Sequence, residues 1–330
     1  MTEEIAYLAL STNFTVDELL KRKQNKSFKD LFYELENDFK IKKDWEKEYD
    51  NLVKQGIKII FQDKLPERLK IAKVLGLYIL GNIEPAFLYL AIVGTRRASQ
   101  EGLKTAENFA SELVNYEIVI VSGAAFGIDT AAHLGAIKSG GKTIAILGEG
   151  IDKFFNTRKN LAEKILTNQG TIISEYAPGT PGLPQNFPNR NRLIAALSDG
   201  IILIEVPEKS GALITAKYAL EYNKDIFVVP HSIYNRNYYG GLRLIQEGAN
   251  LIISTDDILH FYDIQKKDLR TQRNLSDKEK LVYELIQAGP KNLNDLLQVT
   301  AIPINELLSI LTILEIKKFI FNRNGYFYAQ

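Results

Sequence analysis

Short apolar runs alternate with stretches of helical character from residue 56 onward. These runs are rich in isoleucine, leucine and valine and have the length of buried strands. They occupy residues 57–61, 90–93, 118–121, 143–147, 171–174, 201–206 and 226–229. Continuously apolar strands that alternate with helices are typical of a parallel sheet covered by helices on both faces. We therefore predict a doubly wound α/β domain over residues 56–265.

The two flanks of this domain have different patterns. Residues 1–55 carry apolar positions at helical spacing and intermixed charges suited to an exposed face, which predicts a helical N-terminal segment. Residues 266–275 have no periodic apolar face and are predicted to be a linker. Residues 276–330 contain three helical stretches, the first with Ser276 as its N-cap, and then a hairpin pattern that turns near Asn324-Gly325. This order predicts a C-terminal winged-helix domain.

Composition narrows the classes of protein to consider. The chain has 330 residues and no cysteine, which excludes disulfides and thiolate metal sites, and its three histidines lie too far apart for a local metal motif. The first residues are acidic where a signal peptide is basic, and no run reaches the roughly 18 to 20 apolar residues that span a bilayer. We expect a soluble, cytoplasmic protein that binds neither a metal nor a membrane.

Charge marks no region of the chain as a binding site for nucleic acid. The 41 basic residues are balanced by 40 acidic ones, for a net charge of +1, and both signs are spread evenly along the sequence. Binding to nucleic acid would therefore require the fold to gather cations at one site, because overall electrostatic attraction is not available.

Several loops after the predicted strands have the composition of phosphate-binding turns, since glycines and helix N-termini expose backbone N–H groups there. The candidate residues are Gly94, Thr95, Arg96, Ser122, Gly123, Phe187, Arg190, Asn191, Arg192, Ser210, Gly211 and Lys217. The segment 186–200 has the strongest signal, because arginines and an aromatic ring at a helix entrance suit phosphate binding and base stacking. For the segment 91–99, where Ser99 is placed to cap a helix, an ordinary strand-to-helix turn remains an equal alternative.

Two other glycine-rich turns do not support a nucleotide site. Residues 140–143, GGKT, resemble the end of a Walker phosphate loop, but a helix precedes them and a strand follows, which reverses the order of that motif. We interpret Gly140-Gly141 as a helix terminator. The turn at 148–150 lacks the third glycine of a dinucleotide fingerprint, so NAD binding is not supported and no cofactor is expected.

The sequence shows no catalytic machinery. It has no nucleophile elbow, no HExxH motif and no acidic pair at a metal-binding spacing. Glu175 and Glu205, at the ends of two predicted strands, are the best candidates for a catalytic acid. We expect them instead to bind helix N-termini or an arginine, and we predict no catalytic residue and no enzymatic activity.

An ordered series of motifs resembles one protein family. Between residues 90 and 250 the chain contains, in order, GTRRAS, SGAAFGIDTAAHLGAI, TIAILGEGID, SEYAPGT, FPNRNRLIAALSD, KSGALITAKYAL, VVPHS and LIQEGA. These are similar to the motifs of the DNA-processing protein A (DprA/Smf) family. The resemblance implies an extended Rossmann-like fold, single-stranded DNA as the ligand, a homodimer, and delivery of a RecA-type recombinase onto incoming DNA in natural transformation. It also implies a sterile-alpha-motif-like segment at 1–55, and it assigns DNA contacts to all the candidates above except Lys217.

Some positions depart from the family pattern. Phe126 stands where many relatives have a basic residue, so that one phosphate contact is replaced by stacking or lost. His231 replaces a usual glycine, Leu242 replaces a usual asparagine, and Leu65-Pro66 replaces a tyrosine-proline pair. The helix predicted at 304–314 has no basic residue, so we expect a structural or protein-contact role for it, with its apolar face mostly in the core.

The sequence favours a non-catalytic, dimeric protein that binds single-stranded DNA, protects it and loads a RecA-type recombinase. In this hypothesis Arg96, Arg190 and Arg192 contact phosphates and Phe187 offers a face to a base. Two alternatives remain. One is a nucleotide-hydrolysing, phosphoribohydrolase-like enzyme, although the chain lacks the Pro-Gly-Gly of the pattern those enzymes share. The other is a transcription regulator that binds duplex DNA through the winged helix.

Overall fold

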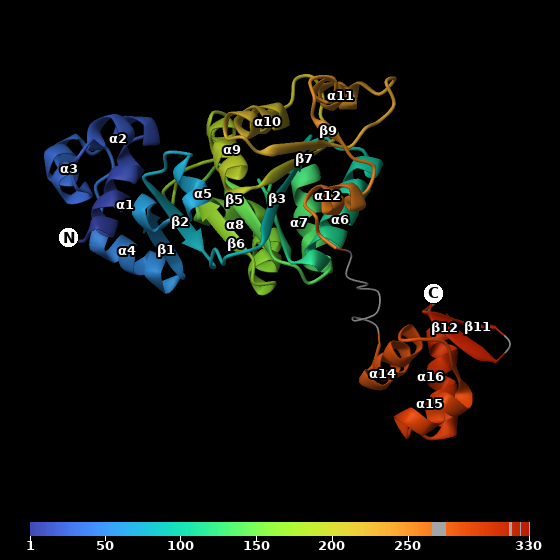
Figure 1. Ribbon diagram of the computed structural model, residues 1–330. Helices are drawn as coiled ribbons and strands as arrows, with labels where there is room; N and C mark the ends of the chain where they lie inside the picture. Colours follow the sequence, from blue (N-terminus) through green and yellow to red (C-terminus); the bar gives the residue numbers. More distant parts are fainter. Residues whose placement is uncertain (266–274, 317–318, 324, 330) are drawn as a thin grey trace. The chain divides into compact units, whose positions relative to one another are not determined.

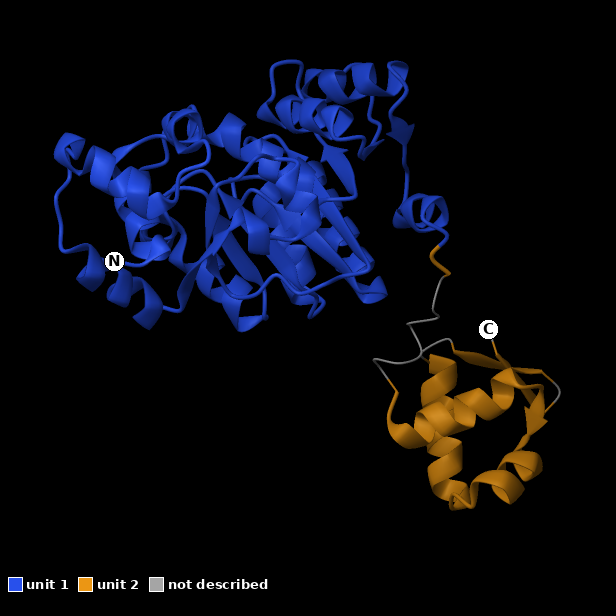
Figure 2. Cartoon of the chain, turned by 60° about the vertical axis from the view of Figure 1, so that its left-hand side comes forward, with its two compact units in different colours: residues 1–263 blue, residues 264–330 orange. Residues whose placement is uncertain are grey.

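The computed structural model describes residues 1–265, 275–316, 319–323 and 325–329 (Figure 1). The chain divides into two compact units, residues 1–263 and 264–330 (Figure 2). The predicted linker at 266–275 lies outside the described residues except for Leu275, and so does Asn324 of the predicted hairpin turn. Each unit has a hydrophobic core of its own.

The first unit is built on a mostly parallel sheet. Its described strands are β1 (Ile57–Phe61), β2 (Gly76–Leu80), β3 (Leu88–Gly94), β4 (Ile118–Ser122), β5 (Thr143–Leu147), β6 (Thr171–Ser174), β7 (Gly200–Ile204), β8 (Asp225–Val228) and β9 (Asn250–Leu251). They lie in the order β1-β2-β6-β5-β4-β3-β7-β8-β9. All pairs from β6 to β9 are parallel. The predicted α/β class is confirmed, and every predicted run forms a strand.

One part of the predicted sheet is wrong. β1 pairs with β2, and β2 with β6, in antiparallel fashion, so residues 57–61 form an antiparallel edge and not a strand of the parallel sheet. A parallel pair needs a long crossover, usually a helix. Between β1 and β2 the chain has only the short turns η2 (Gln62–Lys64) and α5 (Glu67–Lys70).

Helices cover both faces of this sheet (Figure 1). The helices before β1 are α1 (Glu3–Asn13), α2 (Val16–Lys23), α3 (Phe28–Leu35), η1 (Glu36–Asp38) and α4 (Trp45–Lys54). Those after β3 are α6 (Gln100–Leu113), η3 (Val114–Tyr116), α7 (Ile128–Lys138), α8 (Ile151–Thr167), α9 (Asn186–Leu197), α10 (Gly211–Glu221), η4 (Arg236–Tyr238), α11 (Tyr239–Gln246) and α12 (Thr255–Phe261). Ala145 and Leu147 of β5 belong to the buried cluster that contains α8, whereas Ile144 and Ile146 belong to the cluster that contains α9, so the strand is buried on both faces as predicted.

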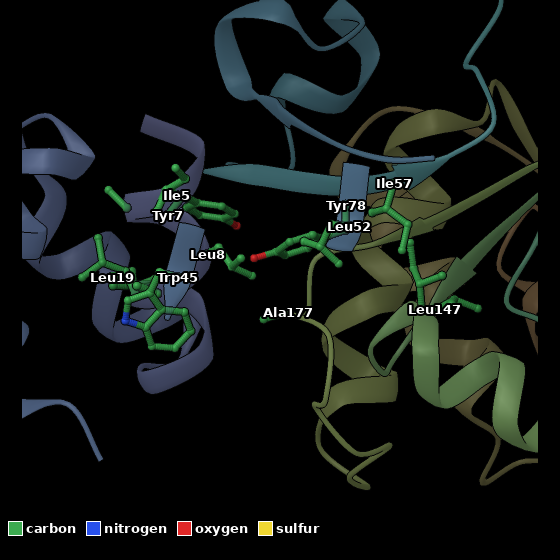
Figure 3. Packing of buried hydrophobic residues seen from close by; sticks show 14 of the residues in the cluster. Ile5, Tyr7, Leu8, Leu19, Trp45, Leu52, Ile57, Tyr78, Leu147 and Ala177 are labelled. Carbon is green, nitrogen blue, oxygen red and sulfur yellow. The ribbon is translucent and has the colours of Figure 1, made fainter. Parts of the chain in front are cut away.

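The N-terminal helices share a core with the sheet (Figure 3). Tyr7 of α1 is buried, and its hydroxyl donates to the Gly76 carbonyl oxygen at 2.9 Å. Its ring stacks on Tyr78 of β2, with centroids 5.9 Å apart. Burial raises the pKa of the Tyr7 hydroxyl, which keeps it a neutral donor. Residues 1–55 therefore belong to the same compact unit as the sheet.

His133 of α7 is a neutral histidine in this unit's interior. Its Nδ1 lies 2.7 Å from Thr143 Oγ1, which itself donates to the Ile120 carbonyl at 2.8 Å, so Nδ1 must carry the proton. Its Nε2 is buried without a hydrogen-bond partner among the described residues. Burial, with help from the charges of Arg190 and Arg158, lowers the pKa of this imidazole to about 3. Protonation in acid therefore places an uncompensated charge in the core.

We expect this histidine to make the fold sensitive to acid. Because its pKa is lowered in the folded state, its stabilising effect is complete above the unfolded value of 6.5 and is lost as the pH falls toward 3. At pH 5 the loss from this group is about 2 kcal/mol. Urea unfolding at pH 5 and pH 8 measures it, and His133→Leu, which cannot take up a proton, should show a weaker pH dependence. Equal pH dependence in the two proteins would contradict the assignment.

The second unit combines helices with a small antiparallel sheet. Its described elements are α14 (Asp277–Gln287), β10 (Lys291–Asn292), α15 (Leu293–Thr300), α16 (Ile304–Ile316), β11 (Ile320–Arg323) and β12 (Tyr326–Ala329), with the strand order β10-β12-β11. Ser276 caps α14, as predicted. Of the apolar residues of α16, Leu307, Ile310, Leu311 and Leu314 lie in the core, whereas Ile304, Leu308, Ile313 and Ile316 are exposed, so its apolar residues are only half internal.

Within the part of the chain that the structure describes, no single helix is long and apolar enough to cross a membrane. The helices α15 and α16 meet that measure only as a pair, and they are bent by 117° relative to each other.

Candidate nucleic-acid interface

A cavity of about 620 Å³ opens at the carboxyl ends of the parallel strands. It is bounded by the turns after β3 and β7, the turn between β4 and α7, and the first turns of α9 and α10. Of the predicted residues, it gathers Gly94, Thr95, Arg96, Phe187, Arg190, Asn191, Ser210 and Gly211. The loops after neighbouring strands thus converge, at the place where open parallel sheets bind ligands.

The turn after β3 is packed tightly against β7. A Cβ atom on Gly94 would overlap the carbonyl oxygen of Ile204, and the Thr95 amide donates to the Glu205 carbonyl at 3.1 Å. Ser99 then caps α6, as predicted. The two arginines between these anchors, at positions 96 and 97, are exposed and pair with no carboxylate among the described residues. The turn therefore holds two free cations at the cavity.

Arg96 rests on the ring of Phe187. The guanidinium carbon lies 4.6 Å from the ring centroid. Cβ atoms built on Gly148 and Gly182 would come within 2.8 and 3.1 Å of the ring, so the backbone approaches it closely. Phe187 is half-buried and lines the cavity, and its ring carries the Arg96 guanidinium, so the predicted stacking of a base on this ring stays a prediction.

Arg190 is buried and forms hydrogen bonds within the fold. It is 3% exposed, and its guanidinium donates to the carbonyl oxygens of Gly123, at 2.6 Å, and Ile146. Burial lowers the pKa of Arg190 to about 10, and the nearby Asp129 opposes that shift, so the guanidinium stays charged at neutral pH. Burial also raises the pKa of the Asp129 carboxyl, against the effect of Arg190. Arg190 therefore ties α9 to β4 and β5 and adds positive potential to the cavity.

Asn191 follows Arg190 and links two loops of the cavity. Its side-chain amide donates to the Gly211 carbonyl at 3.0 Å, which joins the start of α9 to the start of α10. At that second helix Ser210 accepts from the Ala212 amide at 3.2 Å, and the space around Gly211 is open. The N-terminus of α10 thus faces the cavity with room for a ligand.

The remaining predicted residues do not line the cavity: Ser122, Gly123, Arg192 and Lys217. The first two are buried behind it. Arg192 donates to Glu175 at 2.6 Å and to the Ala72 carbonyl at 2.8 Å. Lys217 is exposed and lies 3.9 Å from Glu221 of its own helix. Of the three predicted phosphate-binding arginines, the cavity brings together Arg96 and Arg190 but not Arg192, and Arg190 is buried.

Both candidate catalytic acids are bound in the way the sequence predicts. Glu175 is 2% exposed and pairs with Arg192. Glu205 accepts from the Ser99 amide at 2.8 Å at the start of α6, and from the Asn237 side chain at 3.1 Å. Neither acid lines the cavity. Among the described residues, no group of three or more histidine or acidic side chains could hold a metal.

The excluded GGKT segment also behaves as predicted. The helix α7 ends at Lys138, and Gly140 follows with a φ of +69° that suits a helix terminator. Lys142 pairs with Glu84 and does not line the cavity.

Two cations of the cavity are missing from the predicted set. Arg97 and Lys209 both line it. Each is adjacent in sequence to a predicted residue, and that proximity is the signal that could have found them. With them, the lining carries four cationic side chains and one carboxylate, in a chain whose net charge is +1. The fold has thus concentrated positive charge at one place.

Comparison with known proteins agrees with the motif series. The family model described as DNA recombination-mediator protein A matches residues 57–263. The chain belongs to this family. Among its relatives, the DNA processing protein DprA of Streptococcus pneumoniae (strain ATCC BAA-255 / R6) is 44% identical over 184 residues, which make up 56% of this chain and 65% of that protein. The chain spans less than two thirds of the length of the first curated relatives it matches.

Two solved structures from the family have the same fold. The X-ray structure of DNA processing protein A from Streptococcus pneumoniae matches with a TM-score of 0.63 and 32% identity, over 79% of this chain and 98% of that one. DNA processing protein A from Helicobacter pylori, whose structure gave insight into its single-stranded DNA binding mode, matches with a TM-score of 0.56 and 28% identity, over 63% and 97%. The resemblance to the DprA/Smf family is confirmed.

Proposed function

We propose that this protein binds single-stranded DNA and holds successive phosphates in the cavity at the carboxyl ends of β3 and β7. The observation that carries the proposal is the local charge, with four cationic side chains and one carboxylate on one cavity lining. Because the chain as a whole is nearly neutral, this site provides the electrostatic attraction that a polyanion requires. The relative from Helicobacter pylori, described for its single-stranded DNA binding mode, supports the choice of ligand.

The cationic groups have different tasks in this proposal. Arg96 is exposed, unpaired among the described residues and supported by Phe187, so it binds one phosphate directly. The N-terminus of α10, with open space at Gly211, accommodates a second phosphate, because the helix dipole favours anions there. Arg97 and Lys209 attract the strand at the rim, and the buried Arg190 contributes its charge. Phosphate contacts carry no sequence information, so we expect weak sequence preference.

In the cell, we propose that the protein acts in the cytoplasm as a homodimer that protects incoming DNA and loads a RecA-type recombinase onto it. The motif series and the description of the family as a recombination mediator support this role. We propose that no chemical step is involved. The binding of Glu175 and Glu205 within the fold supports this view, because both acids are held away from the cavity.

Replacing Arg96 tests the proposal directly. Because its guanidinium is exposed and binds no carboxylate among the described residues, Arg96→Ala should leave the melting temperature unchanged. The affinity for single-stranded DNA should fall about tenfold, as expected for the loss of one charge-assisted contact. The slope of log affinity against log salt should flatten by about 0.7. Fluorescence anisotropy with a labelled oligothymidylate over a salt series measures both quantities.

A matched control is Lys64→Ala. Lys64 is also exposed and unpaired among the described residues, but it lies at a second cavity near the amino end of β3. This variant should keep the affinity and salt slope of the wild type. Unchanged binding by Arg96→Ala, or equal losses in both variants, would reject the cavity as the DNA site.

A further inference from the structure

Phe126 exposes an aromatic ring beside the cavity. It lies in the turn between β4 and α7, and Ala125 and Asp129 on either side of it line the cavity. Its side chain is 66% exposed. Single exposed hydrophobic residues are common on protein surfaces, so exposure alone does not show that Phe126 binds a ligand. Its location beside the cavity and its contacts with neighbouring residues are the evidence to consider.

Hydrogen bonds and close packing anchor the turn that carries the ring. The Asp129 carboxylate accepts from the Ala125 amide at 3.4 Å, and the Thr130 hydroxyl donates to the Ala125 carbonyl at 2.5 Å. Gly127 has a φ of +81°, and a Cβ atom there would come within 2.8 Å of the Arg96 carbonyl oxygen. The turn thus packs directly against the loop of Arg96, which fixes the ring relative to that arginine.

Arg158 of α8 covers one face of the ring. Its guanidinium carbon lies 4.0 Å from the centroid of Phe126. The guanidinium also donates to the Thr130 hydroxyl at 2.8 Å and to the Ala124 carbonyl at 3.3 Å, which anchors it to the same turn. With the Arg158 guanidinium on one face, the exposed ring can offer its opposite face and its edge to a ligand.

The other aromatic ring at the cavity, Phe187, is half-buried and already carries the Arg96 guanidinium, so it offers less open surface than Phe126 does. We infer that one unpaired base of the bound strand stacks on the open face of Phe126, next to the phosphate held by Arg96, and that Arg158 positions the ring. This inference rests on the proposed single-strand binding and names a base-stacking site for it. Bases within a duplex are already stacked on each other, so the site favours single strands.

Phe126→Leu tests the site, because leucine keeps apolar volume and removes the aromatic face. We expect about a tenfold loss of affinity for oligothymidylate, the usual size of one base-stacking contact. The salt slope should stay unchanged, since no cation is removed. Phe87→Leu is the control, because Phe87 is 69% exposed and lies just before β3, at the amino end of that strand. It should bind as the wild type does, and all variants should keep the wild-type melting temperature.

Oligothymidylates with a single abasic residue locate the contact. In the wild type, one abasic position should weaken binding about tenfold. In Phe126→Leu the same abasic position should have no further effect, because its partner is already missing. In Arg158→Gln the abasic residue should cause a smaller loss of affinity than in the wild type, while the melting temperature stays unchanged. A general loss of stability would not produce this result.

The outcomes separate this inference from the proposed function. If Arg96→Ala loses affinity while Phe126→Leu binds every abasic oligonucleotide as the wild type does, the stacking site is wrong and the proposed function stands. If the wild type does not bind oligothymidylate, the proposed function fails and the site falls with it. If Phe126→Leu loses affinity only together with a change in oligomeric state, measured by light scattering, the ring is a protein contact and the inference is overturned.

Discussion

Arg190→Met should destabilise the fold by about 3–5 kcal/mol, beyond any effect on DNA binding. The guanidinium is buried and donates to the carbonyl oxygens of Gly123 and Ile146. Its charge also offsets the buried carboxylate of Asp129. The substitution leaves that carboxylate without its counter-charge and two carbonyls without their donor. Urea unfolding at pH 7 measures the loss.

The pH dependence of this variant identifies the cause. Burial raises the pKa of Asp129 and Arg190 opposes the rise, so removing Arg190 should raise that pKa further. The carboxyl then takes up a proton at a higher pH, and the difference from the wild type should shrink as the pH is lowered. The double variant Arg190→Met with Asp129→Asn should recover part of the loss at pH 7. Full stability of Arg190→Met alone would show that the buried charge is not structural.

Gly94→Ala should lower the free energy of unfolding by more than about 3 kcal/mol, which is at the upper end of the effects of overpacking a well-packed site. Gly94 lies opposite Ile204 in the β3–β7 register, and an added Cβ would overlap the Ile204 carbonyl oxygen. It would also come within 2.6 Å of Cγ1 of Ile128. A backbone oxygen in a paired strand cannot move aside as a side chain can. Thermal unfolding followed by circular dichroism measures the effect.

Gly211→Ala is the matched control for that substitution. Both glycines line the cavity, but nothing lies within 4 Å of a Cβ atom placed on Gly211. We expect its melting temperature to stay close to that of the wild type. If the two variants are equally stable, close packing does not explain the glycine at position 94.

The location of the cavity could be predicted from the sequence because it depends on local patterns. Buried strands are visible as apolar runs, and the turns after parallel strands meet at one edge of the sheet. The antiparallel pairing of β1 and β2 could not be predicted from the apolar runs, because it depends on the conformation of the short segment that joins the two strands. The strand at 76–80 was also missed, although its sequence GLYIL is a short apolar run; what the sequence could not give is its antiparallel pairing with β1 and β6.

The sequence could not predict which arginines are bonded within the fold and which are free to bind a ligand, because their partners are distant in sequence. Arg192 donates to the Ala72 carbonyl, 120 positions away, and Arg190 donates to the Gly123 carbonyl, 67 positions away. Local composition reveals a cluster of cations but not which of them the interior uses. Arg158 is the reverse case, since its contact with Phe126 comes from a helix with no phosphate-binding pattern of its own.

The shared core of the N-terminal helices and the sheet has a consequence for dividing the protein into modules. The family match begins at residue 57, but Tyr7 donates to Gly76 and stacks on Tyr78 within the matched region. A fragment of residues 57–263 would therefore lack the helices that cover the aromatic residues of β1 and β2. Its exposed apolar surface would favour aggregation. The boundary of the family match is therefore not a boundary of independent folding, and a fragment meant to fold alone must keep the N-terminal helices.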